Sequence, residues 1–364
     1  MYITKVSGHR QATVAIKKSL KSLAPDVEIK SINGFSYIYP ILEKIVNKAY
    51  MGVIKTTPKI WDFLYDNPRI VEKSGAIQSY LHKTSHVKLA KLFNEFQPDT
   101  VVCTQAFPCG MIADYKRSYH LNFTLIGVLT DFSAHAYWLN QGVDYYIVPS
   151  QEAKDFFLAK GIPGDSIKLY GIPIRTSFTN RLDKTLIAQK IGFDRHIPTI
   201  LIMGGGQGLG PIRDVVKSLI RLELGLQLIV LAGVNKRLIK YLTKIQKKSK
   251  KPLAVYEYTD DVDELMELAA LIVTKPGGMT TSEALAKGLP MVIINPIPGQ
   301  EIRNTNFLIK NGIAIRVDDV KNIGLEIERL LMSPERLRVM SQAAYAHGKP
   351  NAAMDISRLI LQKN

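Results

Sequence analysis

Short apolar runs alternate with helical patterns along the whole sequence, and this alternation limits the possible folds more than any other feature. In runs such as Thr100–Thr104, Thr124–Leu129 and Thr199–Met203, apolar residues follow one another without a period of two. Strands buried on both faces of a parallel sheet have this composition. Helical patterns such as Gln11–Leu23 and Gln151–Lys160 lie between the runs. The sequence therefore predicts an α/β fold with doubly wound parallel sheets.

The alternation begins a second time in the middle of the chain. A Gly- and Pro-containing stretch at Tyr170–Arg181 separates the two series and is typical of a linker. Because 364 residues exceed one ordinary domain, we predict two Rossmann-like domains facing across a cleft. They are an N-terminal domain over 1–172 and a C-terminal domain over 173–340, with a helix in 341–364 that packs back towards the first. The other predicted elements are the strands Tyr2–Val6, Tyr145–Val148, Gln227–Ala232, Ala254–Tyr256, Leu271–Thr274 and Met291–Ile294, and the helices Arg213–Leu222 and Glu283–Lys287.

The chain carries 48 Lys and Arg residues against 32 Asp and Glu residues, a formal net charge of +16. Such an excess attracts nucleic acid, anionic lipid headgroups or phosphorylated substrates, and charge alone does not choose between them. No apolar run reaches the roughly 18–20 residues that span a bilayer, and the first residues lack the apolar core of a signal peptide. Cys103 and Cys109 are too few for a disulfide framework. We therefore expect a reducing cytosol, with attachment to a membrane surface left open.

Two glycine-containing turns each follow a predicted strand and precede a predicted helix. The first is Gly204–Pro211 and the second is Thr274–Ala284. The free N–H groups of a helix start, together with a glycine turn, form a binding site for phosphate. Glu283, one turn into the second helix, can accept hydrogen bonds from two ribose hydroxyls. A plain tight turn in the first segment and a capping carboxylate in the second are the alternatives.

Polar groups that follow other predicted strands suit proton transfer and sugar binding. His9 follows the opening strand, and Asp131 and His135 follow the strand that ends at Leu129. A histidine can accept a proton from a hydroxyl near neutral pH, and a carboxylate can orient it. The loop Asn295–Asn306 gathers amide and carboxylate groups of the kind that bind sugar hydroxyls. A surface histidine at a helix start and ordinary polar loops are the alternatives.

These segments resemble one known family. The segment TKPGGMTTSEALAKGLPMVIINPIPGQEIRNTNF, residues 274–307, is similar to the monogalactosyldiacylglycerol synthase and processive diacylglycerol glucosyltransferase group of glycosyltransferase family 28. LTDFSAHAYW, YGIPIR and VYEYTDDVDELMELA resemble other parts of that family. The resemblance implies a GT-B fold and an inverting hexose transfer from UDP-glucose or UDP-galactose to a lipid, most naturally diacylglycerol. It implies no catalytic metal, no cofactor and no nucleic acid, and a cytoplasmic enzyme attached to the cytoplasmic face of an anionic membrane.

The resemblance also assigns roles to individual residues. It places the diphosphate at Gly206, Gln207, Gly278, Met279 and Thr280, uracil at Tyr258, Thr259 and Val262, ribose at Glu283, and the hexose at Gln300 and Glu301. It makes His9 the base or the group that positions the acceptor, adds Asp131 as a second catalytic residue, and places His135 and Trp138 on the acceptor side. The family usually has several glycines before its histidine, whereas this chain has only Ser7-Gly8. The resemblance therefore does not extend to a backbone contact between the first domain and phosphate, while the role of His9 as base is kept.

Two basic segments are candidates for membrane contact. Leu42–Trp61 mixes lysines with Ile, Val, Tyr and Trp, as interfacial segments do, and Lys236–Lys251 holds eight Lys and Arg residues. Ordinary amphipathic or solvated helices are the alternatives for both. Three other functions also stay open: transfer of N-acetylglucosamine to a polyprenyl-linked cell-wall intermediate, epimerisation of a UDP-sugar, and RNA binding, although no RNA-binding module is recognisable.

Overall fold

The computed structural model describes residues 1–2, 7–40 and 84–362, and the chain divides into two compact units. Unit 1 comprises Met1–Thr176, Ile297–Gln300 and Asn351–Asn364, and unit 2 comprises Ser177–Pro296 and Glu301–Pro350. Residues 3–6 of the predicted first strand and the predicted interfacial segment Leu42–Trp61 lie outside the described residues.

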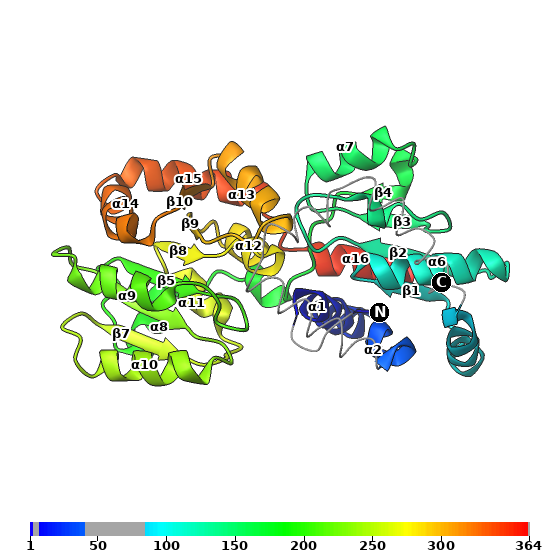
Figure 1. Cartoon of the computed structure of the whole chain (residues 1–364), viewed down its shortest axis with the longest axis horizontal. Helices are drawn as coiled ribbons and strands as arrows, with labels where there is room; N and C mark the ends of the chain where they lie inside the picture. The colour runs from blue at the N-terminus through cyan, green and yellow to red at the C-terminus, as the bar shows by residue number, and fades with distance from the viewer. Residues whose placement is uncertain (3–6, 41–83, 363–364) are drawn as a thin grey trace. The chain divides into compact units, whose positions relative to one another are not determined.

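Unit 1 is built on a parallel sheet whose strands lie in the order β1-β2-β3-β4 (Figure 1). These strands are β1 (Thr100–Cys103), β2 (Thr124–Val128), β3 (Tyr145–Ile147) and β4 (Ile167–Lys168). Its helices include α1 (Gly8–Leu23), α2 (Gly34–Ile38), α6 (Ala106–Ser118), α7 (Gln151–Ala159) and α16 (Ala352–Leu361), with the short 3-10 helices η1 (Ala136–Trp138) and η2 (Gly164–Ser166). Residues 84–96 are helical as well.

Both faces of the unit 1 sheet are covered by helices. On one face α1 packs beside α16, because Ile16 and Ile356 share a core with Ile126 of β2. On the other face α6 inserts Met111 beside Leu125. Successive residues of β2 thus meet different helix layers, and this explains why the strand is apolar without alternation.

Unit 2 is built on a larger parallel sheet in the order β10-β9-β8-β5-β6-β7. These strands are β5 (Thr199–Met203), β6 (Gln227–Leu231), β7 (Leu253–Tyr256), β8 (Leu271–Thr274), β9 (Met291–Ile294) and β10 (Ala314–Val317). Every residue of β5, β6, β8 and β9 is buried. The predicted doubly wound parallel architecture is therefore present in both units.

The helices of unit 2 cover both faces of this sheet (Figure 1). They are α8 (Lys184–Ile191), α9 (Ile212–Arg221), α10 (Lys236–Gln246), α11 (Val262–Leu268), α12 (Gly278–Ala286), α13 (Gln300–Lys310), α14 (Ile323–Leu331) and α15 (Pro334–His347), with η3 (Thr176–Thr179) and η4 (Val320–Asn322). Helices α9, α10 and α14 share one core with β5 and β6. Right-handed connections from β5 to β6 and from β6 to β7 place α9 and α10 on the same face.

Two strands of the structure, β4 and β10, were not predicted, because their sequences lack a long apolar run. β4 has two residues, and β10 lies at the edge of its sheet with Arg316 exposed. An edge strand has only one neighbour and need not be apolar on both faces.

Candidate functional site

The start of α12 presents backbone donors that none of the described residues uses. Gly277 occupies the N-cap position and makes no side-chain cap, and the first intrahelical bond of this turn runs from the Thr281 N–H to the Gly277 carbonyl. No hydrogen bond is recorded for the N–H groups of Gly278, Met279 and Thr280 within the described part of the chain. Three open amides at a helix start form an anion site.

Two buried hydroxyls lie in the same helix. Thr281 is fully buried and Ser282 is 8% exposed, and neither hydroxyl oxygen has a hydrogen-bond partner among the residues described. A buried hydroxyl without a partner carries a desolvation cost, so its presence calls for an explanation. A ligand that accepts hydrogen bonds at this helix end would provide one.

Two glutamates lie near this helix start. Glu283 belongs to α12 itself, and Glu301 belongs to α13 and contacts the loop before α12. Glu283 is half-buried in α12. Glu301, in the first turn of α13, accepts a hydrogen bond from Lys275 Nζ at 2.5 Å, and these side chains are 11% and 20% exposed. The loop after β8 is also held by Asn304, whose amide donates to the Pro276 carbonyl at 2.9 Å. Glu301, one of the two predicted hexose residues, thus lies beside the loop that leads from β8 into the predicted phosphate residues of α12.

Lys275 is a residue that the sequence analysis did not select. It follows β8 directly, and a Cβ on Gly205 would lie 3.4 Å from its side-chain Cε. Lys275 therefore lies between the turn after β5 and the start of α13, three residues before the first residue of α12. The sequence signal was available, since a lysine precedes the Pro-Gly-Gly turn of the matching segment.

The glycine turn after β5 is packed tightly, and this explains much of its composition. A Cβ on Gly204 would lie 2.2 Å from the Leu209 carbonyl oxygen, and a Cβ on Gly208, where φ is +57°, would lie 2.1 Å from the Ala232 carbonyl oxygen. Both positions therefore need glycine for close backbone packing. Gly206 is exposed, and Gln207 is half-buried in the same turn. The turn lies at the carboxyl end of β5, next to β8 in the sheet.

The residues predicted to hold uracil lie at the same edge of the sheet. Tyr258 and Thr259 follow β7, and Val262 is the first residue of α11. Tyr258 is 53% exposed, and the Thr259 hydroxyl accepts the Asp261 N–H at 3.1 Å. Carboxyl ends of parallel strands form the usual ligand edge of such sheets. Unit 2 therefore gathers the predicted donor-binding residues along one edge, with the exception of Gln300, which is assigned to unit 1.

His9 lies at the start of α1 in unit 1, in contact with the residues that follow β1 and β2. Its Nδ1 lies 2.8 Å from the Thr104 carbonyl oxygen, after β1, and 2.8 Å from the Thr130 hydroxyl, after β2. A carbonyl oxygen can only accept, so we place the ring proton on Nδ1 and the lone pair on Nε2. Burial lowers the pKa of His9 from 6.5 to about 4, against an opposing effect of the Thr104 hydrogen bond. His9 is therefore neutral at pH 7.

Asp131 follows Thr130 at the end of β2 and is half-buried. Its carboxylate accepts a hydrogen bond from the Gln300 side-chain amide at 2.9 Å, within the segments assigned to unit 1. The contacts recorded for His9 Nδ1 are to Thr104 and Thr130, so these residues orient the ring. The catalytic role of Asp131 and the hexose-binding role of Gln300 stay predictions.

The two residues predicted on the acceptor side have different surroundings. The His135 ring is half-buried, and its centroid lies 5.8 Å from Tyr137 and 6.3 Å from Trp138. Trp138 is 4% exposed and belongs to the core of unit 1, where a Cβ on Gly127 would lie 3.4 Å from its ring. Trp138 therefore has a structural role in the core of unit 1. Contact with an acceptor stays a prediction for both His135 and Trp138.

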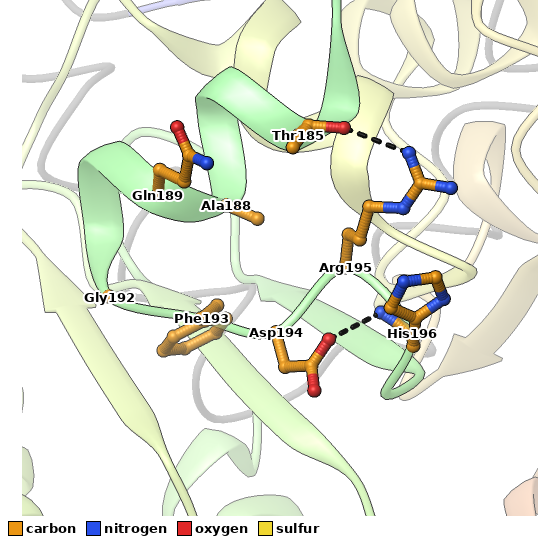
Figure 2. Close-up of a pocket in the computed structure, with 8 residues that line it drawn as sticks. All are labelled: Thr185, Ala188, Gln189, Gly192, Phe193, Asp194, Arg195 and His196. Atoms are coloured by element: carbon orange, nitrogen blue, oxygen red, sulfur yellow. Dashed lines mark hydrogen bonds between the residues drawn. The ribbon is translucent and has the colours of Figure 1, made fainter.

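A surface hollow of about 530 Å³ lies elsewhere in unit 2, between α8 and the loop before β5. Arg195 donates to the Thr185 hydroxyl at 2.9 Å, and the His196 N–H donates to the Asp194 carboxylate at 2.9 Å; both bonds are drawn in Figure 2. None of the predicted site residues lines this hollow. We assign it no part in the site.

Two further observations concern the chain as far as the structure describes it. Within the described ranges, no group of three His, Cys, Asp or Glu side chains is placed to hold a metal ion. None of the described helices is both long and apolar enough to cross a membrane.

Comparison with known proteins identifies the families that this chain matches. Residues 9–174 match the monogalactosyldiacylglycerol (MGDG) synthase family, and residues 199–356 match the glycosyltransferase family 28 C-terminal domain. A processive diacylglycerol beta-glucosyltransferase of Bacillus cereus (strain AH187) is 29% identical over 361 residues, which cover 98% of this chain and 91% of that protein. One from Bacillus mycoides (strain KBAB4) is 28% identical over the same shares.

Solved structures share the fold at low sequence identity. Acinetobacter baumannii MurG superposes with a TM-score of 0.60 at 16% identity, covering 78% of this chain and 79% of that one. S. aureus MnaA with UDP superposes with a TM-score of 0.62 at 14% identity, covering 98% and 94%. The fold and these matches define a glycosyltransferase with the GT-B fold, built of two Rossmann-like domains. The chain belongs to glycosyltransferase family 28, with an MGDG synthase domain in its N-terminal half.

Proposed function

We propose that this chain transfers a hexose from a UDP-hexose to diacylglycerol, with inversion, at the cytoplasmic face of a membrane. The curated relatives are named for diacylglycerol and for glucose, which supports a lipid acceptor and makes UDP-glucose the first donor to test. The match to the MGDG synthase family supports a diacylglycerol acceptor as well. Cys103 and Cys109 are both buried free thiols, as expected in a reducing compartment.

The observation that carries the proposal is the open start of α12. Displacement of UDP develops negative charge on the β-phosphate, and fixed donors stabilise such charge most when they are already in place. The amides of Gly278, Met279 and Thr280 meet this requirement. Lys275, three residues before α12, is paired with Glu301, and the proposal includes neither a catalytic metal nor a cofactor.

His9 is the proposed base in unit 1. The acceptor hydroxyl oxygen attacks the anomeric carbon, the bond from that carbon to the β-phosphate oxygen breaks, and UDP leaves with the electron pair. His9 Nε2 takes the hydroxyl proton while Nδ1–H stays on the Thr104 carbonyl. A single displacement of this kind inverts the anomeric centre and forms no covalent enzyme intermediate.

The proposal is tested by product analysis with several donors. The chain is incubated with UDP-glucose, UDP-galactose or UDP-N-acetylglucosamine and with diacylglycerol in vesicles, and lipid products are measured by mass spectrometry. We expect hexosyl-diacylglycerol, with UDP-glucose the best donor. An altered UDP-sugar in the absence of lipid would show an epimerase instead, and transfer only to a polyprenyl-linked acceptor would show a different lipid substrate.

A further inference from the structure

Helix α10 carries a row of cations along one side. Lys236, Lys240, Lys244 and Lys248 are spaced four residues apart, the last just past the end of the helix, and Lys247 lies beside them. All of them are exposed. Residues four apart are neighbours on a helix surface, so these charges form one continuous strip.

The opposite side of α10 is apolar and faces the core of unit 2. Leu238 is 3% exposed and Leu242 is fully buried, and both pack in the core beneath β5 and β6. The lysine strip therefore points away from the protein. Its orientation is fixed by the packing of the helix, not by contacts of the lysines themselves.

No acidic residue that the structure describes pairs with this strip. Residues 236–256 contain no Asp or Glu, and no ion pair is recorded for the α10 cations within the part of the chain that the structure describes. The last three helices differ, because Arg329, Arg338 and Arg358 each pair with a carboxylate three residues earlier at 2.7, 2.6 and 3.2 Å.

The strip does not favour the helix that carries it. Like charges four residues apart destabilise a helix. Lys236 and Arg237 also lie in the first turn of α10, where the helix dipole is positive and cations are unfavourable. The stability of α10 therefore does not account for the arrangement.

Helix α9 extends the cationic surface. Arg213 and Lys217 lie over the Tyr241 ring of α10, at 4.6 and 5.8 Å from its centroid, and both are exposed. Lys217 also lies 3.9 Å from Asp214, a long exposed pair. We call this surface the α9–α10 face; its residues are Arg213, Lys217, Lys236, Arg237, Lys240, Lys244, Lys247 and Lys248.

We infer that the α9–α10 face docks unit 2 on an anionic lipid surface. The inference rests on the proposed function. A diacylglycerol acceptor lies in a bilayer, so an enzyme that uses it must bind the bilayer surface. Basic residues near an anionic membrane each strengthen binding several-fold. Nucleic acid fits less well, because single-strand sites stack bases on aromatic rings, and the Tyr241 ring is already covered by Arg213 and Lys217.

Vesicle co-sedimentation of the full chain tests the inference. Vesicles are made of phosphatidylcholine alone or of phosphatidylcholine with phosphatidylglycerol, and the test variant carries Lys240→Gln, Lys244→Gln and Lys247→Gln. The control variant carries Lys184→Gln, Arg336→Gln and Arg338→Gln, which are exposed residues of unit 2 outside the face. Both variants lose the same net charge. We expect the test variant to bind anionic vesicles roughly a hundredfold more weakly at low salt, and the control to bind like the parent.

Equal binding of the test variant and the parent overturns the inference, as does equal weakening of test and control variants. Tighter binding to single-stranded RNA than to anionic vesicles at the same salt overturns the choice of partner. Turnover is measured in parallel with diacylglycerol in neutral detergent micelles. The test variant should keep parental turnover there. Absence of turnover in the parent, with charge-dependent vesicle binding retained, would refute the proposed function and leave the docking surface standing.

Discussion

At the scale of single residues, the hydrogen bond from His9 to a backbone carbonyl decides which ring nitrogen can accept a proton. Thr104 contributes a main-chain oxygen, so a side-chain substitution at that position cannot remove the acceptor. The ring is thereby held with Nε2 free to act. The low pKa of His9 keeps this nitrogen unprotonated at neutral pH.

The pH dependence of turnover should reflect this low pKa. The neutral, proton-accepting form of His9 predominates above about pH 4 and is lost only as the pH falls through that value. We therefore expect kcat/KM to show no step near 6.5 and to decline towards pH 4. His9→Gln should lower kcat by roughly 10²- to 10⁴-fold and leave UDP affinity unchanged. A step near 6.5 that disappears in His9→Gln would contradict the assigned pKa, and normal turnover would remove the base role.

Glu283 offers a second test at this scale. If its carboxylate accepts ribose hydroxyls, Glu283→Ala should weaken UDP binding by roughly 10- to 100-fold, since a hydrogen bond to a charged group contributes about 1.5–3 kcal/mol. Isothermal titration calorimetry with UDP measures the change. Glu264→Ala, in α11, is the control. Unchanged affinity in Glu283→Ala would leave this carboxylate without a part in donor binding.

At the scale of elements, α12 combines an uncapped start with a buried ion pair at its end. Its first turn leaves amides for a ligand, and its C-cap residue Lys287 is 1% exposed on the side chain. Lys287 Nζ donates to Glu267 at 2.7 Å and to the Asn180 carbonyl at 2.6 Å. The helix is therefore fixed at one end by the protein and left open at the other.

A cap added to α12 should separate stability from donor binding. Gly277 has φ −70° and ψ 139°, which any residue can adopt, and a Cβ there meets nothing within 4 Å. Gly277→Asp should be about 1 kcal/mol more stable than Gly277→Ala and a few tenths of a kcal/mol more stable than the parent, because its carboxylate caps the open amides and glycine is itself a tolerated N-cap residue. The same carboxylate should repel the diphosphate, so UDP affinity should fall at least tenfold.

Gly277→Ala is the control, since it adds a Cβ without a capping group. Melting temperature and UDP titration are measured for both variants. A capped variant that gains stability and binds UDP normally would show that the α12 start is not the phosphate site.

The buried pair at the other end of α12 predicts a contrast between single and double substitutions. Lys287→Met alone leaves the Glu267 charge buried without its partner and should lower the free energy of unfolding by about 3–5 kcal/mol. Glu267→Leu with Lys287→Met removes both charges and should cost much less. Chemical denaturation measures both. Equal losses in the single and double variants would show that packing, not charge, determines the effect.

Particular elements show what the sequence could predict. β5, β8 and β9 begin and end at the predicted residues because each is a continuous apolar run between polar turns. The Gly-Gly turn indicated a helix start after β8, but the predicted helix Glu283–Lys287 begins five residues after the first residue of α12, Gly278. β4 and β10 were missed because their stability depends on a neighbouring strand. The Thr104–His9 contact spans 95 residues and involves a main-chain atom, so no local pattern encodes it. Lys275 and the buried hydroxyls of Thr281 and Ser282 likewise became visible only through packing.

At the scale of the whole molecule, the proposed donor-binding residues and the proposed base belong to different units. Unit 2 gathers the open amides, Glu283 and Glu301 at the carboxyl edge of its sheet, and unit 1 holds His9 between the ends of β1 and β2. The proposed reaction requires both, because donor activation and proton removal reside in different units. Neither unit alone is expected to transfer sugar.

The most direct test of the account follows the sugar and the nucleotide together. The full chain is given UDP-hexose labelled in the sugar, with diacylglycerol vesicles, and both lipid-bound label and free UDP are counted over time. We predict that each UDP released is matched by one sugar in the lipid phase, and that both signals fall together in His9→Gln. Release of UDP with the label remaining in water would contradict the account.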